Sequence, residues 1–326
     1  MLVGFICAWL AISGPLPRGT QSARGNGYQS FALPAADNHP AQPPDFAVVL
    51  LGGHADVDEA TRYLCDHSRG GEIVVLRATG DDSYNPYFHE ICRRNAAITI
   101  VISGREGAQD PFVATKIREA HAIFVSGGDQ ANYVRLWTGT PVQQEINRAV
   151  ARGVPIGGIS AGLAVQGEFA FSAMHDTVTS KEALANPYDE RVTVERNFLV
   201  VPVLEGIITD SHFTQRGRMG RTVVFLSRIV SAGWARQARA IGVDEATAVL
   251  VDAQGKARVV GRNAAYFVAL RDRPEICVPG KALSVRNVTV HRLESGTAAT
   301  FDLKSWSGVG GSDFTVDVVD GQMTQR

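Results

Sequence analysis

Apolar runs and amphipathic segments alternate along the chain from residue 45 onward. Short continuous apolar runs are typical of strands that are buried on both faces of a sheet, and apolar residues at helical spacing predict the helices between them. We therefore predict strands at 46–51, 73–76, 98–102, 122–125, 154–159, 206–209 and 240–243. We predict helices at 57–67, 84–94, 133–137, 141–152 and 164–173, another that begins at Asp110-Pro111, and another that ends at Val230.

This alternation predicts the α/β fold class, with a mostly parallel sheet covered by helices on both faces. Such sheets bind their ligands beyond the carboxyl ends of the strands. Glycine-marked turns fall at those ends, at Gly52-Gly53, Gly127-Gly128 and 158–162, so we expect a site at this sheet edge. Farther along, alternating segments predict an antiparallel meander at 246–251, 257–260 and 264–270 and C-terminal β-strands at 284–293 and 315–319.

The first 44 residues follow a different pattern. An apolar run from Leu2 to Ser13 is shorter than the roughly 20 residues that span a bilayer, and a polar stretch rich in Gly, Pro and Asn follows it to Pro44. This pattern predicts a signal peptide over 1–25 and a flexible leader over 26–44, hence a secreted or periplasmic protein without a stable membrane span. The alternative is a non-native extension or a wrong start codon, because the run lacks Lys and Arg. The protein would then be cytoplasmic.

We expect the remaining chain to form a catalytic α/β domain over 45–275 and a C-terminal β extension over 276–326 that packs on it. The 326 residues are 45% hydrophobic, enough for a sizeable core. A formal net charge of −1 argues against a nucleic-acid binder, which needs a concentrated positive field. The four cysteines form no Cys-x-x-Cys motif, which excludes a zinc ribbon. In an exported protein Cys65 and Cys92 can pair; buried free thiols are the alternative.

The stretch from Val154 to Ala164 predicts a sharp turn between a strand and a helix. It reads Val-Pro-Ile-Gly-Gly-Ile-Ser-Ala-Gly-Leu-Ala. Gly158 and Gly162 leave room for the turn, and Ser160 lies at its apex, where its Oγ can point into a cleft. The free N–H groups at the start of the following helix face the same place and can bind an oxyanion. Ser160 is therefore the candidate nucleophile.

A serine nucleophile needs a base and a carboxylate that orients the base. Of the eight histidines, His212 closely follows a predicted strand, at the same sheet edge as Ser160, whereas His291 lies on an alternating C-terminal strand. The carboxylates that share this edge are those of Asp210, Asp244 and Glu245. We predict that Ser160, His212 and Glu245 act together, in that chain order.

Basic and amide side chains near these residues suit an anionic substrate. Guanidinium groups bind a carboxylate bidentately, and the candidates are Arg216, Arg218 and Arg221. Gln130 adds an amide at the end of the fourth strand. The alternative for the arginines is a solvated first turn of a helix, and for Gln130 it is solvation of a helix N-terminus.

Four motifs together carry a family resemblance. They are Ser126-Gly-Gly-Asp-Gln130; Gly158-Ile-Ser160-Ala-Gly162; Asp210-Ser-His212-Phe with Arg216, Arg218 and Arg221; and Gly242-Val-Asp-Glu245-Ala-Thr-Ala. From Phe46 to Leu303 the chain resembles the cyanophycinases, serine peptidases of the family that also contains the aspartyl dipeptidases (peptidase E).

The resemblance implies a three-layer α/β/α sandwich, flavodoxin-like and shared with class I glutamine amidotransferases. It implies a serine exopeptidase with Ser160 as nucleophile, His212 as base and Glu245 as the orienting carboxylate. The oxyanion hole would be formed by the N–H groups of Ala161 and of Gly127 or Gly128. The groups that hold a β-Asp-Arg peptide unit would be Gln130, Asp210, Arg216, Arg218 and Arg221. The resemblance further implies a homodimer that uses no metal and no cofactor.

Three residues depart from the family pattern and leave the substrate open. Ile159 and Leu163 are bulkier than the residues that usually flank the nucleophile turn, and Ser211 replaces a common glutamine. Two other functions stand as alternatives. An α/β-hydrolase-type esterase orders its residues Ser, Asp/Glu, His, and would use His291 with Asp244 or Glu245. A non-catalytic relative would only bind a peptide.

Overall fold

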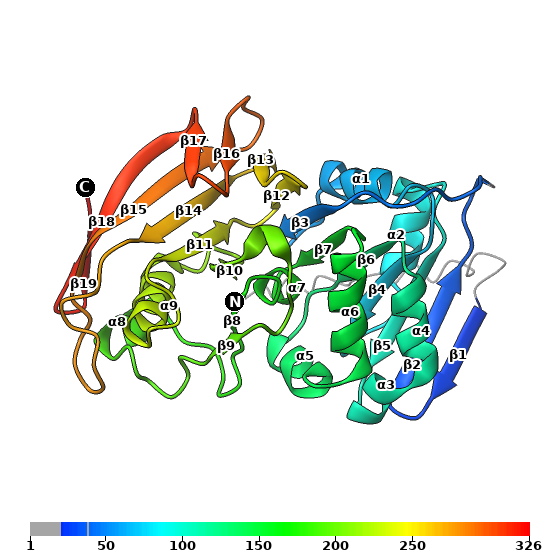
Figure 1. The fold of residues 1–326 in the computed structure, drawn as a ribbon, viewed down its shortest axis with the longest axis horizontal. Coiled ribbons are helices and arrows are strands. Elements are labelled where there is room, and N and C mark those ends of the chain that lie inside the picture. Colours follow the sequence, from blue (N-terminus) through cyan, green and yellow to red (C-terminus); the bar gives the residue numbers. More distant parts are fainter. Residues whose placement is uncertain (1–20, 38) are drawn as a thin grey trace, which may run out of the picture.

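The computed structural model describes residues 21–37 and 39–326, which form two β-sheets covered by helices (Figure 1). In this part of the chain the first sheet has eleven strands. Their spatial order is β1 (Gln21–Gly25), β2 (Tyr28–Leu33), β5 (Ala97–Ile102), β4 (Ile73–Arg77), β6 (Ala122–Val125), β7 (Ile156–Ile159), β3 (Ala47–Leu51), β12 (Thr247–Asp252), β13 (Lys256–Gly261), β16 (Thr300–Asp302) and β17 (Ser307–Val309).

The second sheet has eight strands among the described residues. Their spatial order is β19 (Gln322–Gln325), β18 (Ser312–Val319), β15 (Val285–Glu294), β14 (Ala264–Leu270), β11 (Ala238–Val243), β10 (Ile207–Asp210), β8 (Phe169–Phe171) and β9 (Val194–Arg196). The helices are α1 (Asp58–His67), α2 (Tyr84–Ile91), α3 (Arg105–Gln109), α4 (Pro111–Glu119), α5 (Gln130–Trp137), α6 (Pro141–Ala151), α7 (Ala161–Ala164), α8 (Ser180–Ala185) and α9 (Met219–Ser231), with a 3₁₀ turn at Pro202–Leu204.

Parallel pairing is confined to the centre of each sheet. Strands β5, β4, β6, β7 and β3 are parallel neighbours, as are β8, β10 and β11. The outer strands of both sheets pair antiparallel. The α/β class is confirmed, but the prediction of a mostly parallel sheet is wrong for the molecule as a whole. Short turns can join antiparallel strands, whereas parallel neighbours need a crossover connection.

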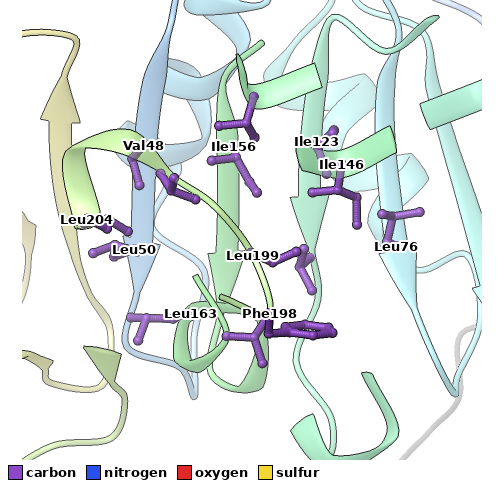
Figure 2. Close-up of a cluster of buried hydrophobic side chains, with 14 of the residues drawn as sticks. Val48, Leu50, Leu76, Ile123, Ile146, Ile156, Leu163, Phe198, Leu199 and Leu204 are labelled. Carbon is purple, nitrogen blue, oxygen red and sulfur yellow. The ribbon is translucent and has the colours of Figure 1, made fainter. Parts of the chain in front are cut away.

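Side chains of β3 alternate between two helical layers. Val48 and Leu50 belong to a cluster with residues of α4, α5 and α6, while Val49 and Leu51 pack with α1 and α2. Figure 2 shows the first cluster, in which the chain from Phe198 to Leu204 crosses over the strand side chains. This central part of the first sheet is therefore a three-layer sandwich.

Strand β14 shows how the second sheet is covered. Tyr266, Val268 and Leu270 join a cluster with α8 and α9. The intervening Ala265 and Phe267 face the cluster shared with the first sheet. Both faces of this strand are buried, which explains its unbroken apolar run.

Several predicted elements differ from the structure. The predicted helix at 164–173 is wrong, because α7 ends at Ala164 and residues 169–171 form β8. The predicted meander at 246–270 is divided, since β12 and β13 belong to the first sheet and β14 pairs with β11 in the second. Local alternation predicts a strand but not which edge it joins.

The N-terminal predictions fall partly outside the described residues. Residues 1–20, including the apolar run of the predicted signal peptide, are not among them. Residues 28–33, which we expected in a flexible leader, form β2 and pair with β5. The open edge of β5 offers unpaired backbone groups, and this strand satisfies them. Within the described residues, every helix is too short or too polar to cross a bilayer.

A disulfide joins Cys65 on α1 to Cys92, which follows α2, with their Cα atoms 5.7 Å apart. Both residues are buried, and the bond links the two helices on one face of the first sheet. The sequence left a bonded pair and free thiols open, and the structure contains the bonded pair. Cys277 is a buried free thiol.

Candidate active site

Ser160 lies at the sharp turn between β7 and α7. Its backbone adopts φ 55° and ψ −110°, a conformation that non-glycine residues rarely occupy. The Ser160 N–H donates to the carbonyl of Leu51 on β3, 3.0 Å away. A side chain at Gly162 would collide with the carbonyl of Val125 on β6. The neighbouring strands therefore hold the turn in a conformation that raises the serine hydroxyl above the sheet edge.

His212 reaches the same point from the end of β10 in the second sheet. Its Nε2 lies 2.7 Å from Oγ of Ser160. Its own N–H donates to the carbonyl of Gly52 at the end of β3, 2.8 Å away. The ring occupies the space beside Gly53, where a Cβ atom would come within 2.6 Å of Nε2. The Gly52-Gly53 turn thus fixes the backbone of His212 and leaves room for its ring.

Glu245, which follows the end of β11, completes a relay of hydrogen bonds that runs from Ser160 through His212. Its Oε1 lies 2.7 Å from Nδ1 of His212. Because an ionised carboxylate only accepts hydrogen bonds, Nδ1 carries the proton and Nε2 is free to accept one from Ser160. The Glu245 N–H donates to Oε1 of Gln215, 3.0 Å away. The structure therefore brings together the three side chains that the sequence selected.

Asp244 has a different partner, which removes it as the orienting carboxylate. Its Oδ1 accepts hydrogen bonds from the N–H of Thr214 at 2.9 Å and from the hydroxyl of Thr214 at 2.7 Å. This contact ties the loop that follows His212 to the loop that carries Glu245. The two neighbouring carboxylates therefore have different roles. Asp244 joins the two loops, and Glu245 contacts the imidazole of His212.

The surroundings keep the His212 imidazole neutral. Burial lowers its pKa, and the nearby guanidinium groups of Arg216 and Arg218 lower it further, although the hydrogen bond to Glu245 opposes both effects. The hydrogen bond from His212 lowers the pKa of Glu245, with smaller effects from the surrounding positive charges. An ionised carboxylate beside a neutral imidazole is the resting state that a general base requires.

The turn after β6 runs beside the serine. A Cβ atom on Gly127 would lie 3.6 Å from Cβ of Ser160. Tyr133 donates its hydroxyl to the carbonyls of Ser126 and Gly127, at 2.9 and 3.0 Å, and so fixes this turn. Gly128 has φ +149° and Ala161 is the first residue of α7, so these N–H candidates lie on the two turns that flank Ser160. Tyr133 was not among the predicted site residues, although it is a tyrosine on the helix that directly follows this glycine turn.

Asp210 and Arg221 form a closed, buried ion pair. Nε and Nη2 of Arg221 donate to the two carboxylate oxygens at 2.8 and 2.6 Å, and Nη1 bonds Thr177 and the carbonyl of Val178. Their side chains are only 4% and 3% exposed. Burial alone would raise the pKa of Asp210, but the guanidinium groups of Arg221 and Arg218 hold it below its usual range.

Asp210 and Arg221 bond each other here, and their direct contact with a substrate stays a prediction. Every donor nitrogen of Arg221 already has a partner inside the protein, so the pair supports the loop that carries His212. Arg218 is partly buried. Its Nη1 donates to Asp210 at 3.1 Å and to the Ser211 carbonyl at 2.8 Å, and burial lowers its pKa to about 10. The periodicity of the sequence could not distinguish these buried cations from an exposed one.

Arg216 is the exposed guanidinium of the predicted set. Residues 211–218 form consecutive turns rather than the start of a helix, and the Arg216 N–H donates to the carbonyl of His212 at 3.1 Å. In the part of the chain that the structure describes, Arg216 forms no ion pair. Gln130 is half-buried at the start of α5 and donates to the carbonyl of Phe171 at 3.4 Å. Of these predicted substrate ligands, Arg216 is the one left most open to a carboxylate.

The alternative base has its own partner elsewhere. His291 lies on β15, and its Nδ1 is 2.6 Å from Oδ1 of Asp313 on β18. Its ring packs near Phe301, in a cavity of about 550 Å³ between the two sheets. The imidazole that contacts Ser160 is that of His212, so the geometry gives no support to an esterase relay through His291.

Comparisons with known proteins show which family this chain resembles. A model described as peptidase family S51 matches residues 81–189. A cyanophycinase from Synechococcus elongatus is 30% identical over 269 residues, which cover 76% of this chain and 77% of that protein. A cyanophycinase from Trichormus variabilis is 27% identical over 267 residues, covering 77% and 84%. The crystal structure of a peptidase from an acI-B1 actinobacterium has a TM-score of 0.53 at 15% identity, covering 80% of this chain and 98% of that one, and supports the α/β fold.

Proposed function

The chain belongs to the cyanophycinase family of serine peptidases, and we propose that it is an exopeptidase that cleaves aspartyl peptides through an acyl-enzyme on Ser160. The observation that carries this proposal is the continuous relay from Oγ of Ser160 through His212 to Glu245, with both contacts at 2.7 Å. A nucleophile, a base and an orienting carboxylate in hydrogen-bond contact are what acyl transfer by serine requires.

The reaction follows from the positions of these groups. Oγ of Ser160 attacks the peptide carbonyl carbon while its proton passes to Nε2 of His212, and Glu245 stabilises the imidazolium. The N–H groups of Ala161 and of Gly127 or Gly128 bind the oxyanion of the tetrahedral intermediate. The intermediate expels the amine, which takes the proton from His212, and leaves an ester on Ser160. Water then gives up a proton to His212 and hydrolyses the ester, which regenerates the hydroxyl.

We propose a β-aspartyl-arginine polymer, or a related aspartyl peptide, as the substrate class. Two relatives that align with most of this chain are named cyanophycinase, and Arg216 offers an exposed cation beside the relay. A guanidinium group is suited to the free carboxylate of an aspartyl unit. Ile159, Leu163 and Ser211 stand where the family pattern has other residues, so activity on both substrates decides between the polymer and shorter peptides.

Incubation with cyanophycin, and in parallel with α- and β-aspartyl dipeptides, tests this proposal. We expect release of β-Asp-Arg from the polymer or cleavage of β-aspartyl dipeptides, and loss of both activities in Ser160→Ala. Ser103→Ala, on an exposed position after β5, is the matched control and should retain wild-type turnover. Cleavage of simple esters alone would contradict the peptidase proposal. Turnover that survives in Ser160→Ala would contradict the acyl-enzyme.

We also propose that the protein is exported and forms a homodimer. The buried Cys65–Cys92 disulfide supports export, because such bonds persist in oxidising compartments and are rare where thiols are kept reduced. The N-terminal sequence of protein purified from its native cells tests the first proposal, since export by a signal peptide requires a mature chain that starts after the apolar run. Sedimentation equilibrium tests the second: a mass near 35 kDa, that of one chain, would contradict it.

A further inference from the structure

A second imidazole lies on the far side of the Glu245 carboxylate. Oε1 of Glu245 contacts His212, while its Oε2 lies 3.9 Å from Nδ1 of His54. The His54 side chain is 72% exposed, and that of Glu245 is 22% exposed. The orienting carboxylate therefore lies between two histidines, one in the relay and one at the protein surface.

The backbone that carries His54 is tied to both partners of the relay. His54 directly follows the Gly52-Gly53 turn at the end of β3. The carbonyl of Gly52 accepts the N–H of His212 at 2.8 Å, and the carbonyl of Gly53 accepts the N–H of Ala246, next to Glu245, at 3.0 Å. His54 itself has φ +69°, in the left-handed region that side chains other than glycine disfavour. This conformation places its ring beside Glu245.

We propose that His54 is a positioning residue that acts through Glu245 to lower the proton affinity of His212 under mildly acidic conditions. When His54 carries a proton, its positive charge offsets part of the carboxylate's negative field. An imidazolium at His212 is then less favoured, so the base stays neutral and active at lower pH. An imidazole ordinarily titrates near pH 6.5, the range in which a histidine base also loses its function. This inference rests on the proposed function of the relay.

Other charged groups also surround this pair. Arg216 lies on the loop after β10 and acts on both His212 and Glu245 as a permanent cation. Arg218 is held by Asp210 and Ser211 on the other side of His212. Asp56, on the same loop as His54, accepts a hydrogen bond from Tyr84 at 3.2 Å, and burial raises the pKa of its carboxyl group. His54 and His212 are thus the two imidazoles that lie beside the Glu245 carboxylate.

The pH profile of kcat/KM in His54→Gln tests this role. In 10 mM salt we expect the acid limb of the profile to move to higher pH by about 0.3 unit, and the difference from wild type to shrink toward pH 8.5. In 1 M NaCl, where screening acts over about 3 Å, the shift should disappear. His54→Lys, which keeps a permanent cation, should place the acid limb at or below its wild-type position. His89→Gln, a histidine on α2 whose ring contacts the carbonyl of Pro34, is the matched control and should leave the profile unchanged.

Superposable profiles of His54→Gln and wild type in 10 mM salt would overturn the role of His54, and so would a shift that persists in 1 M NaCl. Parallel assays of Ser160→Ala separate this outcome from a failure of the proposed function. If Ser160→Ala is inactive while the His54→Gln profile matches wild type, only the role of His54 is wrong. If Ser160→Ala remains active, the relay itself is wrong.

Discussion

The His212 ring occupies the space that a side chain at Gly53 would fill, with Nε2 2.6 Å from the position of a Cβ atom on that glycine. Nε2 is also the atom that contacts Ser160. The end of a first-sheet strand therefore determines where an imidazole from the second sheet can lie. The relay is assembled across the two sheets, and the absence of a side chain at Gly53 leaves room for the imidazole there.

Gly53→Ala should displace this ring and lower kcat by at least about 100-fold, because a displacement of about 1 Å from reactive geometry has an effect of that size. Gly53 also has φ +107°, so the variant should lose some stability. Gly233→Ala is the matched control: it has φ +70°, but a Cβ atom there would meet no other atom within 4 Å. It should lose stability but keep its turnover number. Steady-state kinetics of the two variants, with circular dichroism to verify folding, compare the effects. Equal turnover in both would contradict the steric argument.

Replacing the two candidate bases separately should give opposite results. His212→Ala removes the group in contact with Ser160, so we expect kcat to fall by about 10⁴-fold or more. His291→Ala removes a ring bonded to Asp313 between the sheets, so we expect kcat near the wild-type value with some loss of stability. Turnover on the best peptide substrate, measured alongside thermal melting, checks both. A large loss of kcat in a folded His291→Ala variant would instead support the esterase alternative, in which His291 is the base.

The acid limb of kcat/KM should have its midpoint below pH 6.5. Burial and two nearby guanidinium groups lower the pKa of His212, and the base works only in its neutral form. Activity is therefore complete above that lowered pKa and falls as the pH drops through it. Arg216→Gln removes one of these cations, so its limb should move to higher pH by a few tenths of a unit. Arg273→Gln, on an exposed loop, should leave the limb in place. A wild-type midpoint above pH 6.5 would contradict the assigned environment.

Asp210→Asn should destabilise the fold by about 3–5 kcal/mol, because it leaves the buried guanidinium group of Arg221 without its counter-charge. The exposed pair of Glu59 with Arg258 gives the control, and Glu59→Gln should change stability by less than about 1 kcal/mol. Urea unfolding at pH 7 measures both. Since the pKa of Asp210 is lowered in the folded state, its contribution is present above its usual pKa near 3.9 and is lost as the pH falls below that. Equal midpoints for the two variants would show that the Asp210–Arg221 pair adds little stability.

Reduction of the Cys65–Cys92 bond should lower the free energy of unfolding by about 3–4 kcal/mol, the loop-closure value for a separation of 27 residues. Urea titrations with and without dithiothreitol measure this difference. A double variant with serine at both positions should unfold like the reduced protein and should not respond to the reductant. Cys277 is present in the wild type and in the double variant, so any effect of the reductant on this thiol is the same in both unfolding curves. A wild-type curve that does not change on reduction would indicate that the bond is absent or does not stabilise the fold.

Local pattern in the sequence was enough to find the residues that meet. Strand alternation placed Ser160, His212 and Glu245 directly after buried strands. Because such strands end at a common edge, residue types with complementary chemistry were expected to converge there. The glycine turns at 52–53 and 127–128 could also be predicted from the sequence. A backbone conformation that favours glycine fixes the residue type at that position, whatever the rest of the chain does.

Tertiary packing decided what local pattern could not. Which sheet β14 joins, and whether residues 28–33 form a strand, depend on the open edges that distant segments present. Burial separated Arg221, closed on Asp210, from Arg216, exposed beside the relay, although both lie in one short basic stretch. The place of His54 beside Glu245 likewise depends on contacts among three loops far apart in sequence. Periodicity describes neighbours along one chain segment, whereas burial and charge pairing depend on segments that meet only when the protein folds.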